Sequence, residues 1–260
     1  MQHISIIEPI TPGAMAVISG RREIPKGWAG AGGPPQEDYL LVSENQPIFV
    51  VADGVTLNFE KIIEAGANYP NPSPAGQVAQ TFCEAVMRSA KAKYDSFDQN
   101  NIIEVFREAS REVGRFNQKI GPSAIVGNPT GFFSATGAFV VIKENKAYWA
   151  SICDAYVAHF DQAMNQKFMS SGNCRPYAVI NGEERMAEQI ESGVFDLALG
   201  DRLFIMSDGF EHYFSQPDFL TVFKNWDDQL KERALALSAQ LNQQDPDRFG
   251  HERSLVAIKF

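Results

Sequence analysis

Two apolar stretches, far apart in the chain, each end on an Asp-Gly pair, and this repeated ending is the strongest constraint on the fold. The run "IFVVADG" ends on Asp53-Gly54, and the run "DRLFIMSDG" ends on Asp208-Gly209. The end of a strand is rigid, so an Asp there loses little side-chain freedom when it is held in place. A following Gly allows a tight turn and a close approach of backbone, so the neighbouring carbonyl can also reach a ligand. One such pair is usually only a turn, but two of them favour a shared site.

Further acidic residues lie where strands are expected to begin or end. Glu37 and Asp38 precede the apolar run "YLLV", and Asp154 lies within "ASICDAYVA". Carboxylates that face one another repel and raise each other's pKa values, and a divalent cation relieves this repulsion. Oxygen ligands suit Mg²⁺ or Mn²⁺, whereas His and Cys are scarce near these acids, which disfavours zinc. Two cations sharing an Asp could activate a water molecule for in-line attack on phosphorus.

The order of the expected elements favours an α+β fold. Runs of strands alternate with groups of helices rather than with single helices, so a doubly wound parallel sheet is not expected. We expect two mostly antiparallel sheets packed together with helices outside, in one domain over residues 1–260. Strands are expected in the first fifty residues, including "AMAVISG", then over 134–161 and 253–260; helices are expected over 76–94, 101–120, 182–192 and 228–243.

Composition limits the kinds of binding partner and the cellular compartment that we expect for this protein. The net charge of −9 argues against a nucleic-acid or anionic-membrane surface, because both need a positive field. Three scattered cysteines without a CxxC pair, and no secretion-signal pattern, predict reduced thiols in a cytoplasmic protein. No apolar run is long enough to span a bilayer. The expected protein is therefore cytoplasmic, binds neither nucleic acid nor membrane, and is a monomer.

Taken in order, five motifs resemble those of the metal-dependent serine/threonine protein phosphatases of the type 2C family, in their bacterial form. "PPQEDYLLV" is similar to the family's Glu-Asp strand, and "IFVVADGVT" to its "FxVxDGxGG" motif. "SATGAFVVIKENKAYWASICDAYVAHF" resembles the long segment that ends in "GDSRAYLL". "LALGDRLFIMSDGFEHYF" is similar to "LxxGDxLLLxSDGLxD", and "GHERSLVAIKF" to the terminal "DDRTLVVIxF".

The resemblance implies a four-layer α-β-β-α sandwich with a metal cluster of two or three Mn²⁺ or Mg²⁺ ions at one end of the sheets. It implies that Asp53 bridges two metals, that the Gly54 carbonyl and Glu37 help to hold the first, and that Asp208 ligates the second. Asp154 would contribute to a third, weaker position, and Asp38 would steady the bridging water. Asp38, Asp53 and Asp208 are thus the catalytic candidates. The expected reaction is direct hydrolysis of phosphoserine or phosphothreonine on a protein, without a covalent enzyme intermediate.

Three departures from the family pattern leave alternatives open. His251 and Glu252 stand where the family has its last metal-binding Asp. The position of the family's phosphate-gripping Arg falls in a Gly- and Pro-rich stretch, so Arg21 and Arg22 are the substrate-binding candidates. Cys153 replaces the Gly before Asp154.

These departures motivate two other hypotheses beside the protein phosphatase. A pseudophosphatase would keep the fold but lose a metal, and would act as a regulatory binding module. A small-molecule phosphoesterase would use the same metals on small substrates.

Overall fold

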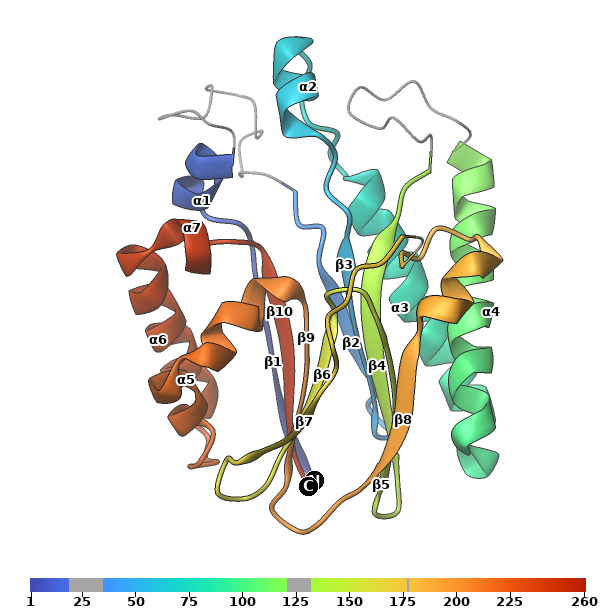
Figure 1. Cartoon of the computed structure of the whole chain (residues 1–260), viewed down its shortest axis with the longest axis vertical. Coiled ribbons are helices and arrows are strands. Elements are labelled where there is room, and N and C mark those ends of the chain that lie inside the picture. Colours follow the sequence, from blue (N-terminus) through green and yellow to red (C-terminus); the bar gives the residue numbers. More distant parts are fainter. Residues whose placement is uncertain (19–34, 121–131, 177) are drawn as a thin grey trace.

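The computed structural model describes residues 1–18, 35–120, 132–176 and 178–260. Their strands form two five-stranded sheets, with orders β1-β10-β9-β6-β7 and β2-β3-β4-β5-β8, and every neighbouring pair is antiparallel. The sheets pack face to face with helices on their outer faces (Figure 1). The prediction of an α+β sandwich is confirmed.

The first sheet is built from the two ends of the chain and from strands between residues 156 and 206. Its strands are β1 (Gln2–Glu8), β10 (Arg253–Lys259), β9 (Arg202–Met206), β6 (Tyr156–Phe160) and β7 (Gln166–Met169). The strands of the second sheet are β2 (Tyr39–Val42), β3 (Ile48–Gly54), β4 (Ala135–Lys143), β5 (Lys146–Ile152) and β8 (Glu191–Asp196).

Three hydrophobic cores separate the four layers. Between the sheets, residues such as Val51, Val140 and Ile205 are buried. A second core joins β3 and β4 to α3 and α4, and a third joins the other sheet to the C-terminal helices. The helices are α1 (Pro12–Ile18), α2 (Phe59–Glu64), α3 (Pro74–Lys93), α4 (Gln99–Ile120), α5 (Pro217–Val222), α6 (Leu230–Gln244) and α7 (Pro246–Phe249), with 3-10 helices η2 (Tyr94–Ser96), η3 (Glu184–Gln189) and η4 (Asp208–Ser215).

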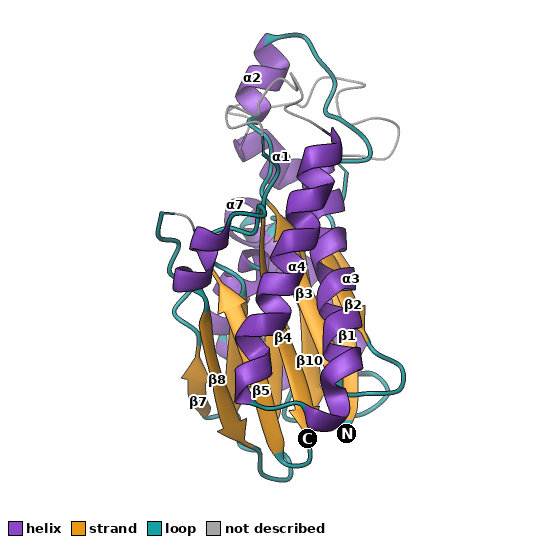
Figure 2. Ribbon diagram, turned by 90° about the vertical axis from the view of Figure 1, so that its right-hand side faces the viewer, coloured by secondary structure: helices purple, strands orange, loops and turns teal. Residues whose placement is uncertain are grey.

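Helix α4 illustrates how sequence spacing gives this layer. Ile102, Val105, Phe106, Ala109 and Val113 are buried, and they recur at the three- and four-residue intervals that place side chains on one face of a helix. The helices α3 and α4 run side by side over the outer face of the second sheet (Figure 2). The expected helices over 76–94 and 101–120 are therefore confirmed.

Two expected elements are wrong. "AMAVISG" was expected as a strand, but Pro12–Ile18 forms helix α1, because a short apolar run does not distinguish a buried helix from a strand. Residues 182–192 were expected as a helix, but they contain the short 3-10 helix η3 and the start of strand β8. Every residue of β8 is partly buried or exposed. As an edge strand with weak alternation, β8 carries little sequence signal.

The expectation of three reduced thiols is also wrong. Cys153 and Cys174 form a disulfide, and Cys83 is buried and free. The cysteines therefore give no support for a reducing compartment, since disulfides are rare there unless they are catalytic or redox-sensing. Within the described ranges, no helix combines the length and the apolar character that crossing a membrane requires.

Candidate metal centre

The acidic candidates lie at strand junctions that share one end of the sandwich. Asp38 directly precedes β2, and Asp53 lies near the end of its antiparallel neighbour β3. In the other sheet, Asp208 follows β9, and Glu252 directly precedes its antiparallel neighbour β10. In an antiparallel pair, the end of one strand meets the start of the next. Because β3 contacts both β9 and β10, the packing of the sheets brings these four junctions together.

Close packing of backbone explains the glycine in each Asp-Gly pair. A Cβ atom on Gly54 would lie 2.5 Å from the backbone of Ala75, at the start of α3. A Cβ atom on Gly209 would lie 2.0 Å from the carbonyl oxygen of Glu252. Both separations are too short for any side chain, so these glycines let another segment pack against the strand end that carries the Asp.

Asp38 is held on one side and free on the other. It is 2% exposed, and its Oδ2 accepts a hydrogen bond of 2.7 Å from the Ser207 hydroxyl. The Ser207 oxygen in turn accepts from the amide of Ser254 at 2.9 Å. The other oxygen of Asp38, Oδ1, is buried without a hydrogen-bond partner. A buried carboxylate oxygen without a donor is costly unless a water molecule or a cation satisfies it.

Glu37 is almost completely buried, and three hydroxyl groups surround its carboxylate. Thr56 donates to Oε2 at 2.7 Å, Tyr69 donates to Oε1 at 2.7 Å, and Ser73 also donates to Oε1. Ser73 also caps helix α3, because its oxygen accepts from the amides of the first turn. Glu37 therefore links the segments on either side of α2, and the start of α3, to the start of β2. Its role toward a cation remains a prediction.

The two candidates for the last metal position have different surroundings. The Oε1 of Glu252 accepts hydrogen bonds from the amides of Glu37 and Asp38 and from the side chain of Gln36. The Nε2 of His251 lies 2.6 Å from the carbonyl oxygen of Asp247, so this nitrogen carries the proton and donates. Glu252 thus faces the acid cluster across the two sheets, whereas one nitrogen of His251 is engaged by α7.

Asp154 lies in the tight turn between β5 and β6, where the chain crosses from one sheet to the other. Its Oδ1 is buried without a partner, as is Asp38 Oδ1. In the described part of the chain, one set of three ligand-type atoms lies within 4.8 Å of one another, formed by the sulfurs of Cys153 and Cys174 and a carboxylate oxygen of Asp154. No other three described His, Cys, Asp or Glu side chains meet this criterion.

The clustered carboxylates raise one another's pKa values. Burial, followed by the negative charges of Asp38 and Asp208, raises the pKa of Asp53 well above its usual range. Burial and then the charge of Asp154 raise the pKa of Asp208 to about 7. Burial and then the charge of Asp38 raise the pKa of Glu252 to about 9, against the effect of the amides that donate to it. The buried acids therefore keep their protons to higher pH than usual, and a bound cation would favour their ionised forms.

The residues fit a hard divalent cation by two criteria. Apart from the imidazole of His251, the candidate metal-ligand side chains are carboxylates, whose oxygens Mg²⁺ and Mn²⁺ prefer. Two of these oxygens, on Asp38 and Asp154, are buried and lack a partner. The positions of Arg21 and Arg22 lie outside the described residues.

Sequence reasoning missed the residues that position the acids. Ser207 and Ser254 are fully buried and connect β9, β10 and Asp38. Each serine interrupts or adjoins an apolar run, in "FIMSDG" and "ERSLVAI", and that interruption was the available signal. Tyr69 and Ser73 lie in a stretch that resembles an ordinary loop, and nothing in the sequence links them to Glu37.

The four layers define an α+β sandwich whose two sheets carry a cluster of acids at their shared end. The family model described as "Protein phosphatase 2C" matches residues 30–244, so the chain belongs to this family and is a phosphatase. No curated protein matches the chain by sequence.

Solved structures share the fold at low sequence identity. The photosystem II phosphatase PBCP is 14% identical with a TM-score of 0.62, covering 100% of this chain and 98% of its own. The Ser-Thr phosphatase MsPP from Mycobacterium smegmatis, in complex with cacodylate, is 15% identical with a TM-score of 0.59, covering 99% and 97%. The catalytic domain of the serine threonine protein phosphatase PstP, in complex with two manganese ions, is 11% identical with a TM-score of 0.59, covering 98% and 96%.

Proposed function

We propose that the chain hydrolyses phosphoserine and phosphothreonine esters on proteins at a carboxylate site for two or three Mn²⁺ or Mg²⁺ ions. The observation that carries this proposal is the convergence of acids from both sheets, with Asp38 Oδ1 and Asp154 Oδ1 buried and without partners. The family match over residues 30–244 supports the same conclusion. A manganese complex among the structures of similar fold agrees with the choice of metal.

Asp53, Asp208 and Asp154 would hold the cations, together with the carbonyl of Gly54. When bound, the cations neutralise the phosphate and lower the pKa of water at the site. Asp38 would orient the attacking water through its free oxygen, because Ser207 fixes the other oxygen. Glu252 would keep Asp38 in position by binding the amide of that residue across the two sheets. Direct attack by water needs no nucleophilic side chain.

A second candidate, the pseudophosphatase, is favoured by one observation. The Nε2 of His251 is bound to a backbone carbonyl, and Glu252 is bound to two backbone amides, so neither is fully free at the last metal position. A protein of this kind would bind a partner through the same fold without turnover.

The test is hydrolysis of p-nitrophenyl phosphate, a phosphothreonine peptide and a sugar phosphate, with Mn²⁺, with Mg²⁺ and with chelator. Asp208→Asn should abolish the metal-dependent rate, and Asp228→Asn, the same change at an exposed position, should leave it intact. Turnover of the peptide well above that of the sugar phosphate supports a protein phosphatase, and the reverse supports a small-molecule phosphoesterase. A folded protein that shows no turnover with either metal would overturn the proposal in favour of the pseudophosphatase.

A further inference from the structure

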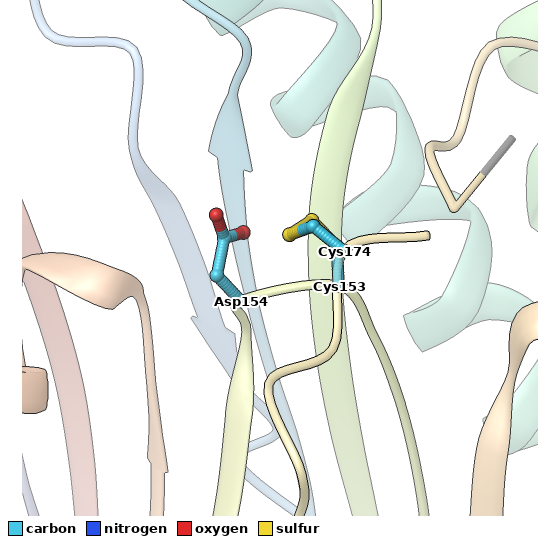
Figure 3. A group of neighbouring side chains, drawn as sticks. All are labelled: Cys153, Asp154 and Cys174. Atoms are coloured by element: carbon cyan, nitrogen blue, oxygen red, sulfur yellow. A yellow bond between two sulfur atoms is a disulfide. The ribbon is translucent and has the colours of Figure 1, made fainter. Parts of the chain in front are cut away.

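The disulfide between Cys153 and Cys174 lies at the edge of the proposed metal centre. Figure 3 shows the two sulfurs beside the carboxylate of Asp154, and the three groups lie within 4.8 Å of one another. The bond joins residues separated by 21 positions. It therefore constrains the segment that carries Asp154, the acid whose Oδ1 lacks a partner.

The disulfide also joins two connections between the sheets. Cys153 and Asp154 form the turn by which the chain leaves β5 in one sheet and enters β6 in the other. Cys174 lies in the segment by which the chain returns from β7 to η3 and β8. Ordinary contacts hold this return segment on both sides of Cys174. Before Cys174, the amide and hydroxyl of Ser171 bind Glu191, and Gly172 packs against the ring of Tyr156. After Cys174, Ile180 pairs with Ala135 of β4 through backbone hydrogen bonds of 2.8 and 3.0 Å. The disulfide adds a covalent link between the middle of the segment and the Asp154 turn.

The backbone at Cys153 suggests that this cysteine has a specific role. Its φ is +57°, in the left-handed region that is strained for a residue other than glycine. A glycine would adopt this backbone without strain, so the thiol itself is the feature that the chain gains from cysteine.

The two cysteines differ in their exposure to solvent. Cys174 is exposed and Cys153 is partly buried, whereas Cys83 is completely buried. A thiolate from outside can therefore attack the Cys174 sulfur, with Cys153 as the leaving thiolate. A second thiolate of the same reagent then releases Cys174 by attack on the mixed disulfide. The net reaction converts the protein disulfide and one dithiol into two protein thiols and one oxidised dithiol.

We propose that Cys153 and Cys174 form an exchangeable redox site, at which a dithiol reductant releases the Asp154 turn and weakens cation binding. A disulfide reagent or a peroxide restores the bond and the affinity. The effect on cation binding rests on the metal site proposed above, and the effect on phosphatase rate rests in addition on the reaction proposed there. Mutation of residues that contact and orient metal ligands typically changes metal affinity by about tenfold or more. Reduction of the disulfide should therefore weaken the weakest Mn²⁺ site by a similar factor.

The first measurement is thiol counting on the folded full-length protein before and after treatment with a dithiol. Two new reactive thiols should appear while far-UV circular dichroism is unchanged, and Cys83 should stay unreactive as an internal control. A disulfide that reacts only after unfolding would overturn the proposal, because the bond would then be a permanent structural link.

The second measurement is Mn²⁺ titration by calorimetry on oxidised wild type, reduced wild type and Cys174→Ser. The serine variant should bind like reduced wild type under both conditions, and Cys153→Gly, which removes the thiol and the backbone strain, should lose redox sensitivity in the same way. Equal Mn²⁺ affinity in oxidised and reduced wild type would refute redox control, even if the melting temperature differed. If no form turns over substrate but reduction still weakens Mn²⁺ binding, the proposed function fails while the redox site stands.

Discussion

Replacement of Glu252 separates its two proposed contributions, the binding of backbone amides and the supply of negative charge. Oε1 accepts from the amides of Glu37 and Asp38, at the start of β2. Glu252→Ala leaves both amides without this acceptor at a mostly buried position. The cost is about 1–3 kcal/mol for each amide, or roughly 2–6 kcal/mol for the two. Glu252→Gln keeps an amide-accepting oxygen and removes the charge.

We therefore expect urea unfolding in chelator to show a large loss of stability for Glu252→Ala. Glu252→Gln should be at least as stable as wild type above neutral pH, because burial and the charge of Asp38 make an ionised Glu252 unfavourable. Mn²⁺ affinity should be nearly unchanged in Glu252→Gln. An equal loss of Mn²⁺ affinity in both variants would refute the reasoning, since it would identify Glu252 as a ligand by charge rather than as a support for Asp38. Glu44→Ala, the same change at an exposed position, serves as the matched control.

Three further predictions concern the same site. Ser207→Ala should lower the free energy of unfolding by about 1–3 kcal/mol in urea titrations, because Asp38 loses its hydroxyl donor; a change below about 0.5 kcal/mol, the range of neutral surface changes, would contradict this. The folded-state pKa of Asp208, about 7, lies above its ordinary value of 3.8, so its contribution to stability is complete below about pH 4 and is lost as the pH rises through 7. The melting temperature of the metal-free protein should therefore fall over this interval, and Mn²⁺ should raise it more at high pH; a flat profile in thermal scans would contradict the assignment. Gly209→Ala should destabilise the fold by several kcal/mol or prevent folding, because the new Cβ would lie 2.0 Å from the Glu252 carbonyl, and a soluble variant with wild-type stability would show that the contact is not tight.

The sequence predicted those parts of the site that depend on local pattern. Asp53 and Asp208 were recognisable because each ends a fully apolar run and is followed by Gly. Asp154 was recognisable from a long motif between two strands. A buried strand and the sharp turn after it both depend on residues next to the Asp, so the local sequence pattern predicts them.

The supporting contacts could not be predicted in this way, because they join residues far apart in the chain. Ser207 meets Asp38 across 169 positions, and Glu252 meets Asp38 across 214. Such pairs depend on how two sheets stack, which strand periodicity does not encode. The pairing of Cys153 with Cys174, 21 positions apart, could not be predicted either, since cysteine spacing alone does not fix connectivity.

Each sheet brings its own acids to the shared end, and this division has a mechanical consequence. Asp38 and Asp53 belong to one sheet and Asp208 to the other, so an ion held between them would resist sliding of one sheet against the other. Without the ion, like charges push the same ends apart. The two sheets should then move closer together at this end when a cation binds. Cation binding should slow the exchange of backbone amide hydrogens most at these strand ends and least at the distant hairpin between β4 and β5.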